Sequence, residues 1–501
     1  MEIFQGLFGG FSVALAGSNI LFCFLGCLLG TVVGILPGLG PAATISLLLP
    51  VVYKMGSPAT SLIFLAGIFY GSMYGGSTTS ILLRIPGEAA SVVTAIDGHE
   101  MAKKGRAGAA LAIAAIGSFI AGTLGVIGMT FLGPGIASFA LKFGPPEYFS
   151  LMLLGLLLAV FLTGDSPVKG CIMLFLGILL ANVGIDPLTG RQRFVFGRIW
   201  LMNGFDFVTI AMGMFGLSEI LLALEEKVSP EFVTTKIGRL WPTAKEWAES
   251  RWAILRGSIV GFFIGVIPGG GAVVSSLVSY SMERKLSKNP EEFGKGSIAA
   301  VAGPESANNA ASSSSFIPLL TLGIPCNATI AMIYAALLIQ GITPGPLLMT
   351  MRPDVFWGVI ASMYIGNVML LILNLPLVPM WVQLLKIPFG LLATIIVLIT
   401  VVGSYSLQNN IFHVYCFIAF GVIGYILRKM KFEPGPLLMS FILAPLMENS
   451  MRQSLVLSEG SLGIFVSRPI SLVFVIVFFA VLVFQIAGNI RKGIAKRAVV
   501  K

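Results

Sequence analysis

Long hydrophobic runs separated by short polar segments cover most of the chain, and two of these runs are interrupted by the same motif. The interruptions read GTVVGILPGLG at 30–40 and GFFIGVIPGGG at 261–271. Both fit the pattern G-x-x-x-G-x-x-P-G-x-G. Proline removes a backbone donor and breaks a helix, whereas glycine lets the backbone turn freely and approach a ligand closely. Two such breaks in matching positions indicate a duplicated membrane fold with a site between the repeats.

The lengths of the hydrophobic runs predict helical membrane segments. The arms of the first broken run, 20–36 and 41–53, would be about 25 and 20 Å long as helices. A hydrocarbon core is about 30 Å thick, so a re-entrant hairpin fits this run better than two full spans. The second broken run covers 253–281. Other spans are predicted near 58–83, 107–140, 147–163, 168–184, 205–224, 298–322, 355–384, 388–403, 411–427, 435–447 and 469–489.

These runs predict an all-α polytopic membrane protein built from two inverted-topology repeats. Each repeat would contain one broken helical hairpin, in a total of about 11–13 membrane segments plus one extra C-terminal span. We assign 1–224 to the first repeat and 225–252 to a cytoplasmic amphipathic linker. The second repeat is assigned to 253–460, and a C-terminal span with a basic cytoplasmic tail to 461–501.

Further matches and the charge pattern favour duplication with inversion. Ser77–Ser80 corresponds to Ser312–Ser315, and the Ile-Pro pair at 85–86 corresponds to the pair at 324–325. Lys and Arg collect on the cytoplasmic side of membrane proteins. In the first half a basic loop at 103–106 follows the polar span, whereas in the second half basic residues at 284–288 follow the broken run. The two halves are therefore expected to insert with opposite orientation.

Composition agrees with a membrane protein and excludes other classes. Of the 501 residues, 56% are hydrophobic and 11% are charged, against about 25% charged in soluble domains. The net charge of +10 lies mainly in short loops and the tail, with no basic face interleaved with stacking aromatics, so nucleic acid is not an expected partner. Cys23 and Cys27 share a helix face without a nearby His or carboxylate, which predicts packing and no structural metal. No cofactor is expected.

The glycine breaks and the polar runs predict a binding site. The amides that begin each second arm attract anions, and the carbonyls that end each first arm can coordinate a small cation. Such a site suits a carboxylate, with Na⁺ or H⁺ as coupling ion. The predicted substrate-binding residues are Gly38, Gly40, Ser77, Thr78, Thr79, Ser80, Gly269, Gly270, Gly271, Asn308, Asn309, Ser312, Ser313, Ser314 and Ser315. The predicted cation-binding residues are Pro37, Pro268, Glu305 and Asn308.

Each of these features has a second interpretation. Ser and Thr can bond to their own helix, and small residues can ease helix packing. Glu305 either binds a cation or proton or caps the N-terminus of its helix. Arg84 either contacts an anionic substrate or extends to the inner interface. Glu88 and Asp97 are interpreted as ordinary loop acids.

Over essentially its whole length the chain resembles the large membrane subunit of tripartite tricarboxylate transporters. The resemblance rests on GILPGLGP at 34–41, YGSMYGGSTTS at 70–80, IPGE at 85–88, IPGGGA at 267–272, PESANN at 304–309 and TLGIP at 321–325. It implies a multi-pass transporter of the bacterial inner membrane, driven by a cation gradient. It also implies a small membrane subunit and a periplasmic receptor as partners, and an organic acid substrate: a tricarboxylate, a dicarboxylate or an aromatic acid. Cys326 and Asn327 depart from the small residues expected there, which puts citrate in doubt.

Two other classes compete with solute–cation symport. An integral-membrane enzyme would need a nucleophile–base pair or metal ligands at depth, and the sequence pattern offers no paired His or carboxylates for this. A passive channel would need a continuous lined pore, whereas two hairpins that meet at mid-membrane favour alternating access.

Overall fold

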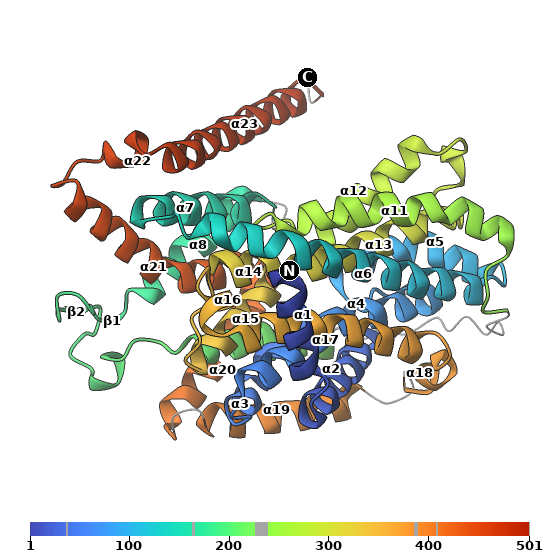
Figure 1. Cartoon of the computed structure of the whole chain (residues 1–501), viewed down its shortest axis with the longest axis horizontal. Helices are drawn as coiled ribbons and strands as arrows, with labels where there is room; N and C mark the ends of the chain where they lie inside the picture. The colour runs from blue at the N-terminus through green and yellow to red at the C-terminus, as the bar shows by residue number, and fades with distance from the viewer. Residues whose placement is uncertain (37–38, 163–165, 226–238, 385–388, 407–408, 500–501) are drawn as a thin grey trace.

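The computed structural model describes the chain except for residues 37–38, 163–165, 226–238, 385–388, 407–408 and 500–501. The described residues are almost entirely helical, and their strands form one short antiparallel pair, β1 (Gly184–Ile185) and β2 (Gln192–Arg193) (Figure 1). The predicted class, an all-α polytopic membrane protein, is confirmed.

The helices of the first half follow the predicted runs closely. They are α1 (Glu2–Ala14), α2 (Gly17–Ile35), α3 (Pro41–Tyr53), α4 (Pro58–Leu83), α5 (Val92–Lys103), α6 (Ala107–Ala140), α7 (Pro145–Leu162), α8 (Pro167–Ala181), α9 (Phe207–Ala211) and α10 (Ser218–Glu225). Short turns add η1 (Ala89–Ser91), η2 (Ile199–Leu201) and a wide π-helical turn, η3 (Met212–Leu217). Of these, α1 and α5 were not predicted.

The second half repeats this agreement. Its helices are α11 (Ala244–Val266), α12 (Gly271–Leu286), α13 (Ala299–Ser314), α14 (Phe316–Leu322), α15 (Ala328–Ile339), α16 (Leu348–Met351), α17 (Pro353–Asn374), α18 (Val378–Leu384), α19 (Phe389–Ser406), α20 (Ile411–Lys429), α21 (Gly435–Leu457), α22 (Ile464–Ser467) and α23 (Pro469–Val499), with a 3₁₀ turn, η4 (Pro290–Glu292). The helices α15, α16 and α22 were not predicted.

Within the described residues, six helical segments are long and apolar enough to cross a membrane. They are Gly17–Ile35, Ala107–Ala140, Pro145–Leu162, Phe207–Glu225, Pro353–Asn374 and Ile411–Lys429. Shorter apolar helices are Pro41–Tyr53, Pro167–Ala181, Ala328–Ile339, Leu392–Ser406 and Pro469–Gln485. The short arm at Pro41–Tyr53 agrees with a broken element rather than a full span.

Both glycine–proline motifs break a helix, as predicted. In the first half α2 ends at Ile35 and α3 begins at Pro41. In the second half α11 ends at Val266 and α12 begins at Gly271. Proline lacks the amide that would continue the helix, which explains the breaks. Two predicted site residues in the first break, Pro37 and Gly38, lie outside the described residues.

The glycines before each break allow two helices to touch along their backbones. A Cβ added at Gly30 or Gly34 of α2 would lie 2.5 or 2.3 Å from a carbonyl oxygen of α4. A Cβ added at Gly261 or Gly265 of α11 would lie 2.1 or 2.5 Å from a carbonyl oxygen of α13. Small residues permit this close approach in membrane helices. The same crossing recurs in each half, which agrees with duplication; the inverted orientation stays a prediction.

Helix α4 and the segment formed by α13 and α14 also end alike. Arg84 ends α4 with φ of 58°, and Gly323 ends α14 with φ of 70°, both in the left-handed region. An Ile-Pro pair follows each of them. The left-handed conformation costs a non-glycine residue roughly 1–2 kcal/mol. The Arg84 side chain is exposed and does not line the cavity described below.

The predicted linker is partly continuous with the second broken element. A capping box between Thr243 and Glu246 starts α11, which runs without interruption to Val266. Residues 244–252 are therefore the first turns of that helix, and the boundary between linker and repeat at 252/253 falls inside it. Arg106 donates Nε and Nη2 to Glu246 at 3.1 and 2.8 Å, which ties this end to the first half.

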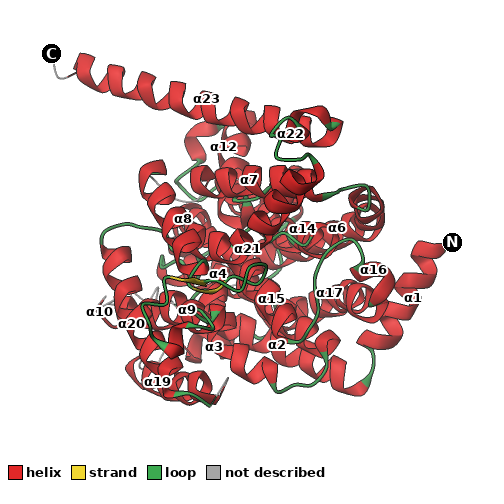
Figure 2. Ribbon diagram, turned by 90° about the vertical axis from the view of Figure 1, so that its left-hand side faces the viewer, coloured by secondary structure: helices red, strands yellow, loops and turns green. Residues whose placement is uncertain are grey.

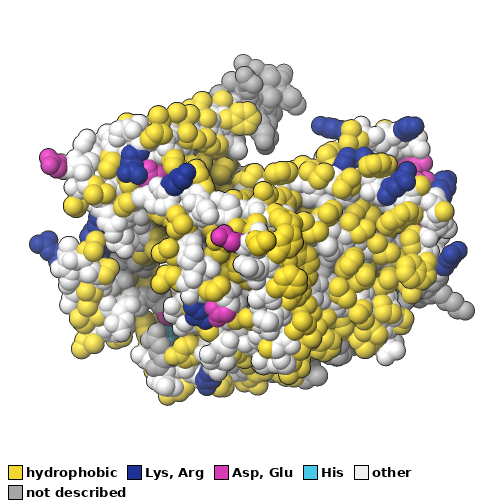
Figure 3. Space-filling view, viewed as in Figure 1, with side chains coloured by type: hydrophobic (Ala, Val, Ile, Leu, Met, Phe, Trp, Pro, Cys, Tyr) yellow, Lys and Arg dark blue, Asp and Glu magenta, His cyan; other side chains and the backbone are white. Residues whose placement is uncertain are grey.

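Basic loops of both halves meet at one end of the molecule. Lys104 Nζ donates to the carbonyl of Lys295 at 2.5 Å. Figure 3 shows a largely hydrophobic right half of the face, with Lys and Arg gathered along its right-hand edge.

Helix α23 runs along one edge of the bundle (Figure 2) and is held to α7 by a Ser150–Ser471 hydrogen bond of 2.8 Å. Its assignment as an extra span outside the repeats stays a prediction.

Cysteine labelling can test the inverted orientation. Ser18 and Lys245 lie at the start of the equivalent helices α2 and α11, and both are exposed. We expect S18C and K245C to react with a membrane-impermeant maleimide from opposite sides of oriented vesicles. The native cysteines Cys23 and Cys27 are buried, and the partly exposed Cys171 is replaced by serine in both variants so that it does not react. Labelling of both variants from one side would contradict inversion.

Candidate functional site

The ends of the two broken elements line one cavity of about 830 Å³. From the first half it is lined by Gly40 and the start of α3, and by the loop from Ile85 to Ala89. From the second half it is lined by Gly269–Gly271, the start of α12, and Asn327. The structure thus brings together two motifs that are more than 200 residues apart in sequence.

Both second arms turn their N-termini to this cavity. Gly40 is the residue directly before α3, and Gly270 is the residue directly before α12. Gly269 has φ of 80° and donates its N–H to the carbonyl of Cys326 at 2.7 Å, which fixes the turn. The first amides of a helix have no partner within the helix and favour an anion. The cavity therefore has two places suited to negative charge.

The loop after α4 reaches the cavity because glycine permits a very close backbone contact. A Cβ added at Gly87 would lie 1.8 Å from the carbonyl oxygen of Gly34. This contact holds Glu88 at the cavity wall, where the residue is only 6% exposed. Glu88 Oε2 accepts from the Ala90 N–H at 2.6 Å, whereas the buried Oε1 has no partner among the described residues. The interpretation of Glu88 as an ordinary loop acid is wrong.

Three further charged residues at the cavity were missed by the sequence analysis. Arg428 comes from the last turn of α20, Glu219 from α10, and Glu433 from the turn that follows α20. Arg428 Nε is buried and has no hydrogen-bond partner in the described part of the chain. These residues can be recognised as part of the site only from their positions in the folded structure.

The predicted polar runs lie elsewhere. All are buried in α4 and α13 or, for Ser315, between α13 and α14, and none is among the residues that line the cavity. The hydroxyls of Ser312 and Ser313 donate to the carbonyl of Asn309, and those of Ser314 and Ser315 to the carbonyl of Ala311. In this structure the serines make the self-bonding contacts of the second interpretation.

The matching run in α4 makes mixed contacts. Thr79 Oγ1 donates to the Gly76 carbonyl at 3.3 Å, and Ser80 Oγ donates to Ser91 Oγ at 2.9 Å. Thr78 is buried in the same helix. Ser77 instead reaches across to the second half, where it contacts Glu305.

Glu305 is fully buried and receives donors from three helices. Its Oε2 accepts from Ser77 Oγ at 2.6 Å and from Asn308 Nδ2 at 3.2 Å, and its Oε1 accepts from Thr94 Oγ1. Helix α13 begins at Ala299, six residues earlier, so the interpretation of Glu305 as an N-terminal cap is wrong. Its hydrogen-bond partners in the described part of the chain include no Lys or Arg. A buried carboxylate without a basic partner is a functional candidate.

The other residues of this group contribute to the packing around Glu305. Asn309 Nδ2 donates to Ser118 Oγ of α6 at 2.7 Å and to Asn308 Oδ1 at 2.5 Å.

Pro268, predicted to help bind a cation, lies between α11 and α12 and faces Gly155 of α7. It does not line the cavity.

Asp97 is also not an ordinary loop acid. It is fully buried in α5 and accepts from the backbone N–H groups of Gly294, Gly296 and Ser297 at 2.8–2.9 Å. Tyr280 of α12 donates to it at 2.9 Å. The carboxylate therefore joins the first half to the loop that follows the second broken element.

Asn327, one of the two residues that depart from the family pattern, lines the cavity. Its Oδ1 accepts from the Ile330 N–H at 2.9 Å and caps α15, and its Nδ2 lies 3.3 Å from Ser315 Oγ. A Cβ added at Gly271 would lie 3.8 Å from this Nδ2. The amide is thus close to the N-terminus of α12.

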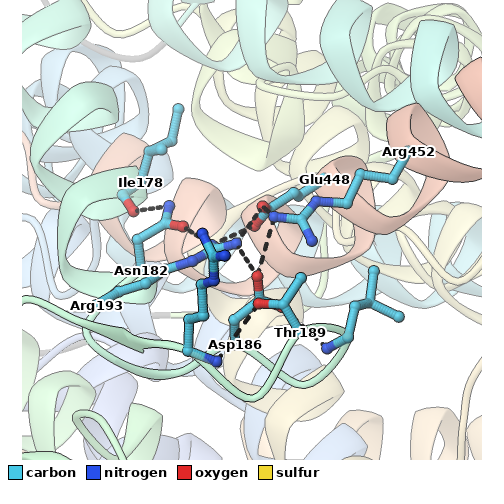
Figure 4. Close-up of polar contacts among 9 residues, drawn as sticks. Ile178, Asn182, Asp186, Thr189, Arg193, Glu448 and Arg452 are labelled. Carbon is cyan, nitrogen blue, oxygen red and sulfur yellow. Dashed lines mark hydrogen bonds and ion pairs between the residues drawn. The ribbon is translucent and has the colours of Figure 1, made fainter. Parts of the chain in front are cut away.

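An ion cluster around Arg193 lies at the other end of the molecule. Arg193 Nη2 lies 2.5 Å from Asp186 Oδ2 and 2.8 Å from Glu448 Oε1, and Arg452 Nη2 lies 3.1 Å from Asp186 Oδ2 (Figure 4). The cluster fixes the loop with β1 and β2 to α21. The N–H of Leu188 donates to the Asp186 carboxylate, and together with the two arginines it holds the pKa of Asp186 well below its ordinary value.

This depressed pKa predicts pH-dependent stability. A carboxyl with a lower pKa in the folded state stabilises it above the unfolded pKa, and that contribution is lost as the pH falls below it. We expect the detergent-solubilised protein to lose thermal stability between pH 5 and about pH 3. Asp186→Asn should lower the melting temperature at pH 7 and flatten this pH dependence. An equal pH dependence in the variant and the wild type would exclude Asp186 as the cause.

Comparison with known proteins gives one family and two relatives. The family model described as "Tripartite tricarboxylate transporter TctA family" matches residues 20–439. A protein of Agrobacterium vitis, described as "Uncharacterized 52.8 kDa protein in TAR-I ttuC' 3'region", is 49% identical over 491 residues, 98% of each chain. A second, from the TAR-II ttuC' 3'region of the same organism, is 53% identical over 211 residues, 42% of this chain and 87% of that protein. No solved structure matches the chain.

Proposed function

Because this chain belongs to the tripartite tricarboxylate transporter TctA family, and is therefore a subunit of a membrane transporter, we propose that it imports an organic carboxylate by cation symport. The substrate is a tricarboxylate, a dicarboxylate or an aromatic acid, and access to its site alternates between the two sides of the bacterial inner membrane. A periplasmic receptor delivers the substrate, and a small membrane subunit completes the transporter.

One observation carries this proposal: the cavity between the two broken elements. Its volume of about 830 Å³ is within the range of about 300–1,000 Å³ that is usual for small-molecule sites. It lies where the N-termini of α3 and α12 come together, and broken helices of this kind bind anionic groups in other transporter folds. A carboxylate is the organic group that best fits such amides.

The coupling ion, Na⁺ or H⁺, is assigned to Glu305. The carboxylate belongs to the second half, whereas two of its three donors, Ser77 and Thr94, belong to the first. Because residues of both halves surround this carboxylate, its affinity for a cation or proton depends on how the two halves are placed relative to each other. Symport requires such a dependence. Carboxylate, hydroxyl and amide oxygens are the ligands that a hard cation prefers, and a buried carboxyl can also carry a proton.

Uptake into proteoliposomes tests the proposal. The purified transporter, with its small subunit and receptor, is given radiolabelled citrate, succinate or benzoate under an inward Na⁺ gradient, an inward proton gradient, or neither. We expect accumulation of one substrate class only with receptor and one of the two gradients, and loss of accumulation on adding the matching ionophore. Uptake that needs the receptor but no ion gradient would overturn symport.

A further inference from the structure

Arg428 differs from three other paired arginines of this protein in how it holds its carboxylate. Arg106, Arg256 and Arg352 each bind their partner through Nε and Nη2, at distances of 2.6–3.1 Å. Among the residues that the structure describes, Arg428 has one ion-pair contact, from Nη2 to Glu219 Oε2, at 3.6 Å. Charge-assisted pairs are usually about 2.7–2.9 Å long. Glu219 therefore does not use the Nε and Nη2 donors of Arg428 as a bidentate pair.

Arg428 lines the cavity and has one donor without a partner. Its Nε is buried without a partner in the described part of the chain, and the residue lines the cavity between the broken elements. The guanidinium lies over the ring of Phe215, 5.4 Å from its centroid, which fixes its plane. A buried guanidinium N–H without an acceptor is costly, so this position favours a second carboxylate.

Glu219 itself occupies a place suited to an anion. Its carboxylate lies at the start of α3, where a Cβ added at Gly40 would be 3.4 Å from Oε1. Its Oε2 would be 4.0 Å from the same Cβ. Glu219 thus lies between the N-terminus of α3 and Arg428, the two positive groups at this side of the cavity.

The local structure around Glu219 is built for this placement. The π-helical turn η3 (Met212–Leu217) directly precedes the helix that carries it, and such turns are frequent at functional sites. Gly421 and Gly424 of α20 allow close contact with this segment: a Cβ at either would lie within 3.0 Å of Leu217 or Ser218 side-chain atoms. The same glycines therefore set the distance between Glu219 and Arg428.

We propose that Glu219 is an internal carboxylate that occupies the anion subsite formed by Arg428 and the Gly40 end of α3, and that a substrate carboxylate displaces it. This inference rests on the proposed function. In the absence of substrate, Glu219 balances the charge of Arg428. A substrate carboxylate takes Nε and Nη2 of Arg428 as a bidentate pair, and Glu219 moves away from the Gly40 amide. The other end of the cavity, at Gly271 and Asn327, receives the remainder of the substrate.

A matched control pair is present on the same two helices. Glu225 of α10 pairs with Lys429 of α20, with Oε1 and Nζ 2.6 Å apart. Both side chains are 48% exposed, and neither residue lines the cavity. Glu225→Gln removes the same charge from the same helix without touching the subsite.

The test measures binding of citrate, succinate and benzoate to the purified full-length protein, by calorimetry at constant ionic strength. If Glu219 occupies the subsite about nine-tenths of the time, Glu219→Gln should lower the dissociation constant about tenfold. Arg428→Gln should weaken binding at least about tenfold. Glu225→Gln should bind like the wild type, and melting temperatures should show that all three variants are folded.

Each other outcome has a defined meaning. Equal or weaker binding by Glu219→Gln, when the wild type binds, overturns the displaced carboxylate but leaves the proposed transport function intact. Wild-type affinity in folded Arg428→Gln also overturns the subsite. If the wild type and all variants bind none of the three acids, both the subsite and the proposed substrate class fail.

Discussion

Replacing Glu305 with glutamine is expected to abolish cation-driven uptake while the protein still inserts and folds. The substitution keeps the shape of the side chain but removes the charge that Ser77, Thr94 and Asn308 surround. Hydrogen bonds to charged groups are worth about 1.5–3 kcal/mol each. A loss of about 2.7 kcal/mol at the coupling site corresponds to about a hundredfold fall in uptake.

The measurement is the initial rate of radiolabelled substrate uptake into proteoliposomes, with and without the ion gradient. Ser77→Ala removes one donor and should cause a smaller fall, of about tenfold, since one hydrogen bond to a charged group contributes about 1.5 kcal/mol at the lower end. Glu100→Gln is the control, because Glu100 is an accessible carboxylate paired with Lys103 outside this group. Unchanged gradient-driven uptake by Glu305→Gln would remove Glu305 from the coupling mechanism.

The second large effect is structural: Gly261→Val should prevent the accumulation of folded protein. A Cβ at this position would lie 2.1 Å from the Ala307 carbonyl oxygen, a contact with backbone that cannot move aside alone. Overpacking of this kind costs about 1–3 kcal/mol, and backbone contacts lie at the upper end. The crossing of α11 and α13 would have to open, which also moves Glu305 away from its donors on α4 and α5.

Gly135→Val provides the matched control. Gly135 also lies in a long membrane helix, α6, but a Cβ added there would meet nothing within 4 Å. We expect near-normal yield and melting temperature for Gly135→Val, and strongly reduced yield for Gly261→Val in the same membranes. Similar yields of the two variants would show that the close helix crossing is not required for folding.

The elements of this fold could be predicted from the sequence where a local rule governs them. Hydrophobic runs of sufficient length predicted the long helices. The prolines at 37 and 268 predicted the two breaks, because a proline removes a backbone donor from the helix in which it lies. The helix α5 was missed because it is short and only weakly apolar, and it is kept in place by tertiary contacts such as those of Asp97 with the loop at 294–297.

The candidate site was predictable only in part, for a similar reason. Gly40 and Gly269–Gly271 reach the cavity because they end broken helices, which the sequence shows directly. Arg428 and Glu219 face each other only because η3 and the glycines of α20 set the approach of two distant helices. A serine run has the same sequence pattern whether it lines a site or bonds to its own helix, so its contacts had to be seen.

The glycine crossings constrain how this protein can move. Where α2 meets α4, and α11 meets α13, carbonyl oxygens of one helix fit closely against the glycines of the other. Each pair of crossed helices is therefore expected to move as one rigid unit. The second arms, α3 and α12, lie beyond the breaks and are not clamped to α4 or α13 in this way. Hinge motion in the second half should consequently be concentrated at the turn between α11 and α12, while each pair of crossed helices moves as one unit.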